Sequence, residues 1–160
     1  YYYCRHFHQE SRLLLVGPHT IGSYTRMLGS LARVLDLKEV HITGSVNDEQ
    51  LFAYYRVASV FVSMSEHEGF CLPLLESMYF GLPVVAYAGA AVPWTMGGSG
   101  VLFKEKDLPL VAGLIDCLQK NERWREEVLA GQRRRLASFS RHRLQEQLLG
   151  LLSNWLGVRL

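Results

Sequence analysis

Residues 60–87 read VFVSMSEHEGFCLPLLESMYFGLPVVAY and contain a short apolar run at each end. The runs at 60–62 and 83–87 have the length and composition typical of buried strands. Between them, Pro73 suits the first position of a helix, and Gly81 with a proline just beyond it is typical of a helix end. The stretch therefore predicts a strand, a loop, a helix and a second strand, in that order.

The same alternation continues toward the N-terminus. Apolar runs at 12–16 and 40–43 predict two further strands, and a glycine follows each run. Residues 21–37 carry apolar side chains at steps of three and four, which describe one face of a helix. After the second run, Asp48 is predicted to cap another helix.

Toward the C-terminus, residues 100–103 predict a short fifth strand. From Asp107 onward the pattern is helical, with breaks near Asn121 and at Ser138–Ser140. Strands that alternate with helices pair in parallel through right-handed crossovers, and helices cover both faces of the sheet. The predicted fold class is therefore α/β, with one doubly wound parallel sheet and a helical C-terminus.

The composition favours a single folded domain. The chain has 160 residues, of which 49% are hydrophobic and 20% charged, and a chain of this size buries enough surface for one core. Its 17 basic and 15 acidic residues give a net charge of +2, which argues against a dedicated nucleic-acid-binding protein. No uncharged apolar run reaches the roughly 18 residues that would predict a membrane span.

The cysteine and histidine positions predict no metal site. Cys4, Cys71 and Cys117 are widely spaced and odd in number, which is typical of reduced thiols in the cytoplasm. No acidic or cysteine partner completes a set of metal ligands with His6 and His8, and no Asp-x-Asp motif occurs. We therefore expect a cytoplasmic protein without a metal.

Three loops are expected at one edge of the sheet. They are residues 44–47, 63–72 and 88–100, and each follows a predicted strand. In open α/β sheets, ligands bind beyond the carboxyl ends of the strands. We therefore expect the functional residues in these loops.

Two carboxylates, Glu68 and Glu76, bracket the second loop and the first turn of its helix. A helix N-terminus offers unpaired N–H groups that suit a phosphate, and Gly69 lets the backbone approach a ligand closely. A carboxylate inside the helix can accept two charge-assisted hydrogen bonds from neighbouring hydroxyls, such as a ribose diol. This chemistry favours a nucleotide-sugar over a bare phosphate.

The residues around these two acids resemble those of a known family. EGFCLPLLE, followed by SMYFGLPVVA, is similar to the E-x7-E signature of retaining GT-B glycosyltransferases of the GT4-like family, also called glycosyltransferase group 1. The preceding VHITGSVNDEQLFAYYRVASVFVSMS at 40–65 resembles that family's sequence before the signature. The likeness extends from about Leu13 to Leu118. It implies a Rossmann-like fold that forms one half of a GT-B enzyme, the C-terminal donor-binding domain.

The resemblance also implies roles for individual residues. Glu76 would hold the ribose hydroxyls of a nucleoside diphosphate, and Glu68 would act as the catalytic residue, facing the donor sugar near the reacting centre. The remaining donor-binding residues implied by the family pattern fall in two groups. In the signature loop, backbone N–H groups would bind the sugar hydroxyls and the diphosphate, namely those of Gly69, Phe70, Cys71 and Leu72. After the second strand, Gly44 and Val46 would also bind the donor, with Val46 near the base.

The implied activity belongs to a longer enzyme. Residues 1–160 would be the C-terminal nucleotide-sugar-binding domain, with the N-terminal acceptor domain absent from this chain. The enzyme would be a retaining, metal-independent hexosyltransferase of polysaccharide biosynthesis, moving a sugar from a nucleoside-diphosphate sugar to a glycan or lipid-linked acceptor without a cofactor. The domain's first strand, with an Arg and a Lys that neutralise the diphosphate, is expected before Tyr1, and residues 1–9 are expected to end the helix after it. This chain alone is expected to bind the donor without turnover.

Three features depart from the family pattern. Met64 stands where the family usually has proline, Cys71 stands where it has glycine, and residues 88–94 replace its glycine-rich G-G-x-P-E loop. Two alternatives therefore stay open. One is a related GT-B sugar-nucleotide 2-epimerase, and the other is a non-catalytic sugar-nucleotide-binding module.

Four further features allow two interpretations each. His67 is either an acid or base or an exposed loop histidine, and Trp94 either packs in the core or lines the donor pocket. Residues 97–100 (GGSG) lack the ending of a phosphate-binding P-loop, which favours a flexible turn. The seven arginines of residues 123–143 form either a solvated helix face or a surface for an anionic membrane or lipid-linked acceptor at the inner membrane face.

Overall fold

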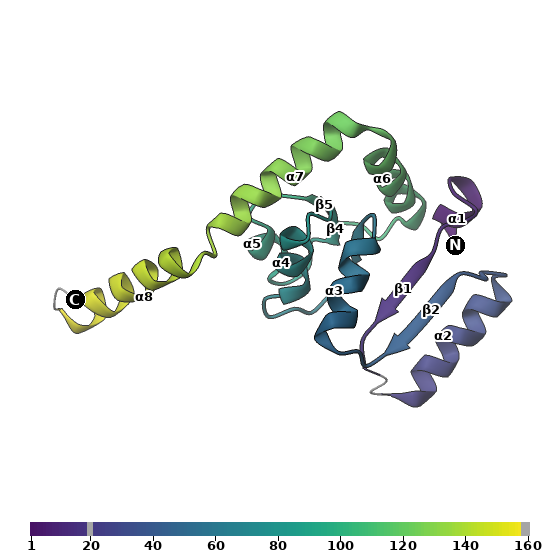
Figure 1. Ribbon diagram of the computed structural model, residues 1–160, viewed down its shortest axis with the longest axis horizontal. Coiled ribbons are helices and arrows are strands. Elements are labelled where there is room, and N and C mark those ends of the chain that lie inside the picture. Colours follow the sequence, from purple (N-terminus) through teal and green to yellow (C-terminus); the bar gives the residue numbers. More distant parts are fainter. Residues whose placement is uncertain (19–20, 158–160) are drawn as a thin grey trace. The chain divides into compact units, whose positions relative to one another are not determined.

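The computed structural model describes residues 1–18 and 21–157. The chain divides into two compact units. The first unit comprises Tyr1–Val60 and Glu105–Glu122, and the second comprises Phe61–Lys104 and Arg123–Leu160. Each unit contains its own parallel sheet with helices beside it (Figure 1).

The first unit is built on a two-stranded parallel sheet. Its strands pair in the register Leu13↔Val40, Leu14↔His41 and Leu15↔Ile42. The elements of this unit, in chain order, are α1 (Tyr2–His6), β1 (Leu13–Val16), α2 (Gly22–Val34), β2 (Val40–Gly44), α3 (Asp48–Val57) and α6 (Leu108–Lys120).

Side-chain caps set where two of these helices begin. Asp107 caps α6 by accepting a hydrogen bond from the Leu110 N–H at 3.1 Å. The prediction that Asp48 caps α3 is wrong, because Asn47 does so. The Asn47 side chain accepts from the Gln50 N–H at 2.9 Å, and the Gln50 side chain accepts from the Asn47 N–H at 3.1 Å. This reciprocal capping box leaves Asp48 as the first helical residue, where its charge favours the helix dipole.

The second unit is built on a three-stranded parallel sheet in the order β3-β4-β5. Its central strand is fully covered, since Val84, Val85 and Ala86 are all buried. The elements, in chain order, are β3 (Phe61–Ser63), α4 (Leu72–Tyr79), β4 (Val84–Tyr87), α5 (Val92–Met96), β5 (Val101–Phe103), α7 (Glu122–Ala137) and α8 (Arg141–Leu156).

A Schellman turn joins α4 to β4, which confirms the predicted helix end. Gly81 has a φ of +71°, which a residue with a Cβ adopts only at a cost. Its N–H donates to the Met78 carbonyl at 3.1 Å, and the Leu82 N–H donates to the Ser77 carbonyl at 2.9 Å. The turn delivers the chain directly into the buried strand β4.

The core of the second unit lies between β4, α4 and α5. Its buried members are Cys71, Leu74, Met78, Val84, Ala86, Val92 and Met96. Gln132 of α7 is also buried, and its side chain accepts from the Val84 N–H at 2.8 Å and donates to the Leu82 carbonyl at 2.6 Å. One polar side chain therefore ties α7 to the start of the central strand.

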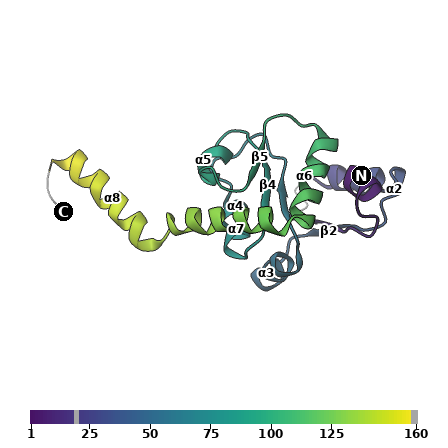
Figure 2. The same cartoon turned by 90° about the horizontal axis from the view of Figure 1, so that it is seen from above.

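The C-terminal part is helical, as predicted, with the breaks at the predicted places. Asn121 ends α6, and Ser140 caps α8. Figure 2 shows α7 and α8 as two successive helices of this part of the chain. Exposed ion pairs join Arg123 to Glu127 at 3.1 Å and Arg133 to Glu126 at 3.7 Å, as on a solvated helix face. Among the described residues, no helix combines the length and apolar character needed to cross a membrane.

The α/β class and all five predicted strands are confirmed, and every ladder is parallel. The single continuous sheet is not found, since the described strands form a two-stranded and a three-stranded sheet. Periodicity along one segment identifies a strand, because it reflects burial of that strand's own side chains. It does not identify the neighbouring strand, because backbone N–H and C=O groups are the same in every residue type except proline.

Candidate functional site

The signature loop, residues 64–71, leaves the carboxyl end of β3 and enters α4. The loop and the first turns of α4 hold six of the eight predicted site residues. Of these, Cys71 is buried, Glu68, Phe70 and Glu76 are half-buried, and Gly69 and Leu72 are exposed. The structure therefore brings these six residues together in one segment of the second unit.

The N-terminus of α4 has no side-chain cap. Cys71 occupies the cap position without a capping hydrogen bond, Pro73 lies in the first turn, and that turn contains no acidic residue. The orphan N–H groups and the positive end of the helix dipole are therefore not neutralised by the helix's own side chains. Such an end favours an anionic ligand.

The segment after β4 supports the signature loop through backbone contacts. The Ala91 N–H donates to the Glu68 carbonyl at 3.3 Å, and the Thr95 hydroxyl donates to the Phe70 carbonyl at 2.6 Å. A Cβ on Gly89 would lie 2.9 Å from the Tyr87 ring and 3.1 Å from the Glu66 carbonyl oxygen. Glycine at position 89 therefore avoids a clash with the Tyr87 ring and a tight contact with the signature loop.

These supporting residues were not found from the sequence. Thr95 is separated from Phe70 by 25 positions, and no local spacing links the two. The available signal was weak: Thr95 is a polar residue that lies between two apolar ones, Val92 and Met96, all three of which are fully buried. A buried hydroxyl needs a hydrogen-bond acceptor, but the sequence does not show which one.

Trp94 does not pack in the core. Its side chain is 64% exposed, and its ring lies 5.9 Å from the Phe70 ring and 6.2 Å from the Phe139 ring, centroid to centroid. The Arg135 guanidinium lies 5.4 Å from the Trp94 ring centroid and 4.5 Å from that of Phe139. Trp94 therefore belongs to an exposed aromatic cluster beside the signature loop.

Cys71, at the position where the resembling family has glycine, has a strained backbone conformation. Its φ is +63°, a left-handed conformation in which a side chain is unfavourable and the family's glycine is not. Burial raises the pKa of the Cys71 thiol, and the neighbouring Glu68 carboxylate raises that pKa further. The thiol therefore stays neutral at physiological pH.

We expect the three cysteines to react with iodoacetamide in a fixed order. The thiolate is the nucleophile, and Cys71 is both buried and raised in pKa, whereas Cys117 is exposed and Cys4 is half-buried. Mass spectrometry of the folded chain at pH 8 should show Cys117 modified first and Cys71 last. Equal rates for Cys71 and Cys117 would contradict the buried position of Cys71.

The same shift makes stability depend on pH in the alkaline range. Because the Cys71 pKa in the folded state lies above the ordinary value of 9.0, its contribution is present below that pH and is lost as the pH rises through the folded value. Wild type should therefore lose more stability than Cys71→Ala between pH 9 and the folded pKa. Parallel loss in both proteins, measured by urea unfolding, would contradict it.

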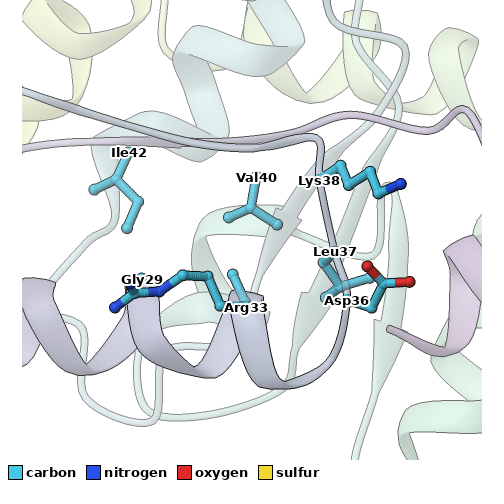
Figure 3. Close-up of a pocket in the computed structure, with 8 residues that line it drawn as sticks. Gly29, Arg33, Asp36, Leu37, Lys38, Val40 and Ile42 are labelled. Atoms are coloured by element: carbon cyan, nitrogen blue, oxygen red, sulfur yellow. The ribbon is translucent and has the colours of Figure 1, made fainter.

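Two predicted site residues lie in the first unit. Gly44 ends β2 with a φ of +72° and is buried, and Val46 is half-buried just before the Asn47 cap. Their predicted contacts with a nucleotide base remain predictions. The same unit contains a hollow of about 350 Å³ lined by residues of α2, of β2 and of the segment between them, among them Gly29, Arg33 and Val40 (Figure 3). None of the predicted donor residues lines it.

Two other features of the sequence have clear positions. Residues 97–100 form a turn with positive φ at three glycines, and the Ser99 hydroxyl donates to the Met96 carbonyl at 2.6 Å, so the turn prediction is confirmed. His67 is exposed. Over residues 1–18 and 21–157, no three or more His, Cys, Asp or Glu side chains gather as a metal-binding group.

Comparison with known proteins decides the family. Residues 4–142 match the family described as Glycosyl transferases group 1. The chain belongs to this family. The predicted resemblance is confirmed, and the glycosyl transferase group 1 fold accounts for the parallel strands that alternate with helices.

The glycosyl transferase group 1 domain is similar to enzymes and to an isolated domain. It is 34% identical over 87 residues to the O-antigen chain mannosyltransferase B of Escherichia coli, covering 54% of this chain and 23% of the relative. It matches Anabaena HepE in complex with UDP and glucose with a TM-score of 0.73 at 22% identity, covering 89% and 40%. It matches the C-terminal domain of LpcC from Francisella tularensis with a TM-score of 0.69 at 19% identity, covering 85% and 72%. The chain thus spans less than half of the first two proteins and most of a C-terminal domain.

Proposed function

We propose that this chain is the donor-binding domain of a retaining glycosyltransferase that uses a nucleoside-diphosphate sugar. One observation carries the proposal: the acids of the E-x7-E signature flank an uncapped helix N-terminus at the carboxyl edge of a parallel sheet. The mannosyltransferase relative and the UDP-bound structural neighbour support a sugar-nucleotide ligand. A hexose, such as mannose, is the proposed sugar.

Each group at the site has a proposed task. The start of α4 binds the diphosphate, because it lies at the positive end of the helix and has no side-chain cap, although the Leu74 N–H already donates to the Cys71 carbonyl at 3.0 Å. Glu76, one turn further along α4, accepts hydrogen bonds from the ribose diol. Glu68 faces the sugar and stabilises the positive charge that develops there as the diphosphate departs.

We propose that a second domain holds the acceptor. The chain covers 40% of HepE and 72% of the LpcC C-terminal domain, which supports a partner domain in the same protein. An acceptor must be positioned against the sugar for transfer, and positioning supplies a large part of the rate. The chain alone should therefore bind donor without transferring it. A glycan or lipid-linked acceptor at the cytoplasmic membrane face completes the proposal.

Replacing Glu76 with glutamine tests the ribose contact. Loss of the carboxylate should weaken binding of the nucleoside diphosphate by about 1.5–3 kcal/mol, the range for a hydrogen bond to a charged group. Calorimetry with UDP and with GDP measures the change. The fold should be unaffected, since glutamate and glutamine have nearly equal helix propensities.

The matched control is Glu126→Gln, which makes the same change on α7 at an exposed ion pair with Arg133. Its affinity for either nucleotide should equal that of wild type, because exposed pairs contribute little. Equal nucleotide affinities for Glu76→Gln and wild type would reject the ribose role. Equal losses in both variants would also reject it, because the effect would then follow net charge.

Donor binding and transfer should not require a divalent cation. Helix N–H groups at α4, together with basic residues elsewhere in the protein, are proposed to meet the diphosphate charge. Calorimetry of nucleotide binding in EDTA and in magnesium should give the same affinity. Transfer by the full-length protein that stops in EDTA and returns with magnesium or manganese would contradict this proposal. Product analysis in the same assay separates sugar transfer from 2-epimerisation.

A further inference from the structure

Arg135 of α7 makes an unusual set of contacts for an arginine in a basic run. Its Nε donates to the Thr95 carbonyl at 2.9 Å, its Nη2 donates to the Trp94 carbonyl at 2.5 Å, and its Nη1 donates to the Ser138 hydroxyl at 3.3 Å. Within the described part of the chain, no carboxylate pairs with it, in contrast to Arg123 and Arg133. The guanidinium therefore forms hydrogen bonds with two backbone carbonyls and one hydroxyl, and not an ion pair with one of the described carboxylates.

The two carbonyls belong to the end of α5, a helix of only five residues. The last carbonyls of any helix lack partners inside it, and so short a helix does not hold its own shape in water. Arg135 supplies both the hydrogen bonds and the positive charge that such an end favours. A Cβ on Gly97, the residue after α5, would lie 2.5 Å from the Arg135 Nε, so the guanidinium packs directly on this helix end.

The same five-residue helix, α5, supports the signature loop through hydrogen bonds. The Thr95 hydroxyl donates to the Phe70 carbonyl at 2.6 Å, and the Ala91 N–H, just before the helix, donates to the Glu68 carbonyl at 3.3 Å. Arg135 binds the carbonyl of Thr95, and Thr95 binds the loop through its hydroxyl. A chain of two hydrogen bonds therefore links α7 to the loop.

Aromatic rings provide a second set of contacts between Arg135 and the signature loop. The Phe70 ring lies 5.9 Å from that of Trp94 and 5.7 Å from that of Phe139, and the Arg135 guanidinium stacks on both of these rings. Cation–π contacts of this kind hold a planar guanidinium in one orientation. The loop residue Phe70 is thus held by its carbonyl and by its ring.

We propose that Arg135 is a positioning residue for the donor site. It acts through α5 and Thr95 to hold the signature loop, residues 64–71, in the conformation that presents Glu68 and the start of α4 to the donor. It does not touch the donor itself. This inference rests on the proposed function for its effect on donor binding, but the bracing of the loop can be measured without any ligand.

The test compares two neighbouring arginines. Arg135→Gln removes the guanidinium, and Arg134→Gln makes the same charge change at the adjacent, exposed position of α7. Hydrogen exchange of the 160-residue chain without ligand should show amides 66–72 exchanging about ten-fold faster in Arg135→Gln, whereas the β4 amides stay unchanged. UDP or GDP affinity should fall by about ten- to a hundred-fold, the effect of losing one hydrogen bond to the charged diphosphate. Arg134→Gln should match wild type in both measurements.

Conservative variants separate positioning from general destabilisation. Arg135→Lys keeps the charge but cannot bind two carbonyls through a planar fork, so it should recover only part of the affinity. Thr95→Ser keeps the hydroxyl and should retain the affinity, whereas Thr95→Val should lose it. Because Arg135 and Thr95 act in series, the double variant Arg135→Gln/Thr95→Val should bind no more weakly than the weaker single variant.

Three outcomes would overturn the proposal: unchanged exchange at 66–72 in Arg135→Gln, equal effects of Arg134→Gln and Arg135→Gln, or full affinity in Thr95→Val. A different result would bear on the proposed function alone. If neither wild type nor any variant binds UDP or GDP, while hydrogen exchange of the loop is still faster in Arg135→Gln, the proposed donor site is rejected. The proposal that Arg135 holds the signature loop is then supported.

Discussion

Replacing Gln132 with leucine should lower the free energy of unfolding by about 3 kcal/mol. The Gln132 side chain is 1% exposed, accepts from the Val84 N–H and donates to the Leu82 carbonyl. Leucine has a similar volume but leaves both buried backbone groups without a partner, and each such group costs roughly 1–3 kcal/mol. Urea unfolding followed by circular dichroism measures the change.

Gln119→Leu is the matched control for this prediction. Gln119 is also a helical glutamine that donates to a backbone carbonyl, that of Ser59 at 3.3 Å, but its side chain is exposed. Water can replace its hydrogen bond, so the change should be within about 0.5 kcal/mol. If Gln132→Leu and Gln119→Leu have equal effects, the tie between α7 and β4 contributes nothing beyond an ordinary surface contact.

Replacing Glu68 with glutamine should reduce kcat of the full-length enzyme by about a hundred- to a thousand-fold. We propose that the carboxylate faces a sugar that becomes positively charged in the transition state, and an amide of the same shape cannot provide that stabilisation. Loss of one preorganised electrostatic group at a reacting centre has an effect of about this size, roughly 2.7–4 kcal/mol. Affinity for UDP or GDP should change much less, because the nucleotide lacks the sugar.

His67→Ala resolves the remaining candidate in the same loop. His67 is exposed beside the half-buried Glu68, and removal of an exposed imidazole should leave kcat within about two-fold of wild type if it has no acid–base role. A large loss in His67→Ala with little loss in Glu68→Gln would exchange the two assignments. Equal rates for Glu68→Gln and wild type would reject the catalytic role of Glu68.

Much of the local structure could be predicted because its causes are local. The buried run PVVAY predicted β4, and the glycine at 81 predicted the end of α4, since burial of apolar side chains and a left-handed turn leave direct marks in a sequence. The N-cap of α3 was misplaced by one residue. Asn47 and Asp48 are both good caps, and the choice depends on which of them has extended backbone angles.

The candidate site was only partly predictable for a similar reason. The acids Glu68 and Glu76 were identified because EGFCLPLLE and the residues around it resemble the signature of the family, and such a signature is a property of one short segment. The groups that hold this segment were not identified: Thr95 lies 25 positions from its acceptor Phe70, and Arg135 lies 40 positions from Thr95. The run RRR at 133–135 predicts three solvated arginines. In the structure Arg133 and Arg134 are exposed, whereas Arg135 donates hydrogen bonds to α5.

The sequence by itself determined the α/β class and the order of the five strands, because both follow from periodicity within a few turns of chain, and its resemblance to the family marked Glu68 and Glu76 as candidates. It did not predict the short helix α5, which lies within the predicted loop at 88–100. Only the tertiary structure decided how five parallel strands divide into two sheets, which buried glutamine completes the start of β4, and which arginine supports the signature loop. These features depend on hydrogen bonds between distant segments. Backbone donors and acceptors look alike along the whole chain, so their partners are set by packing and not by local residue pattern.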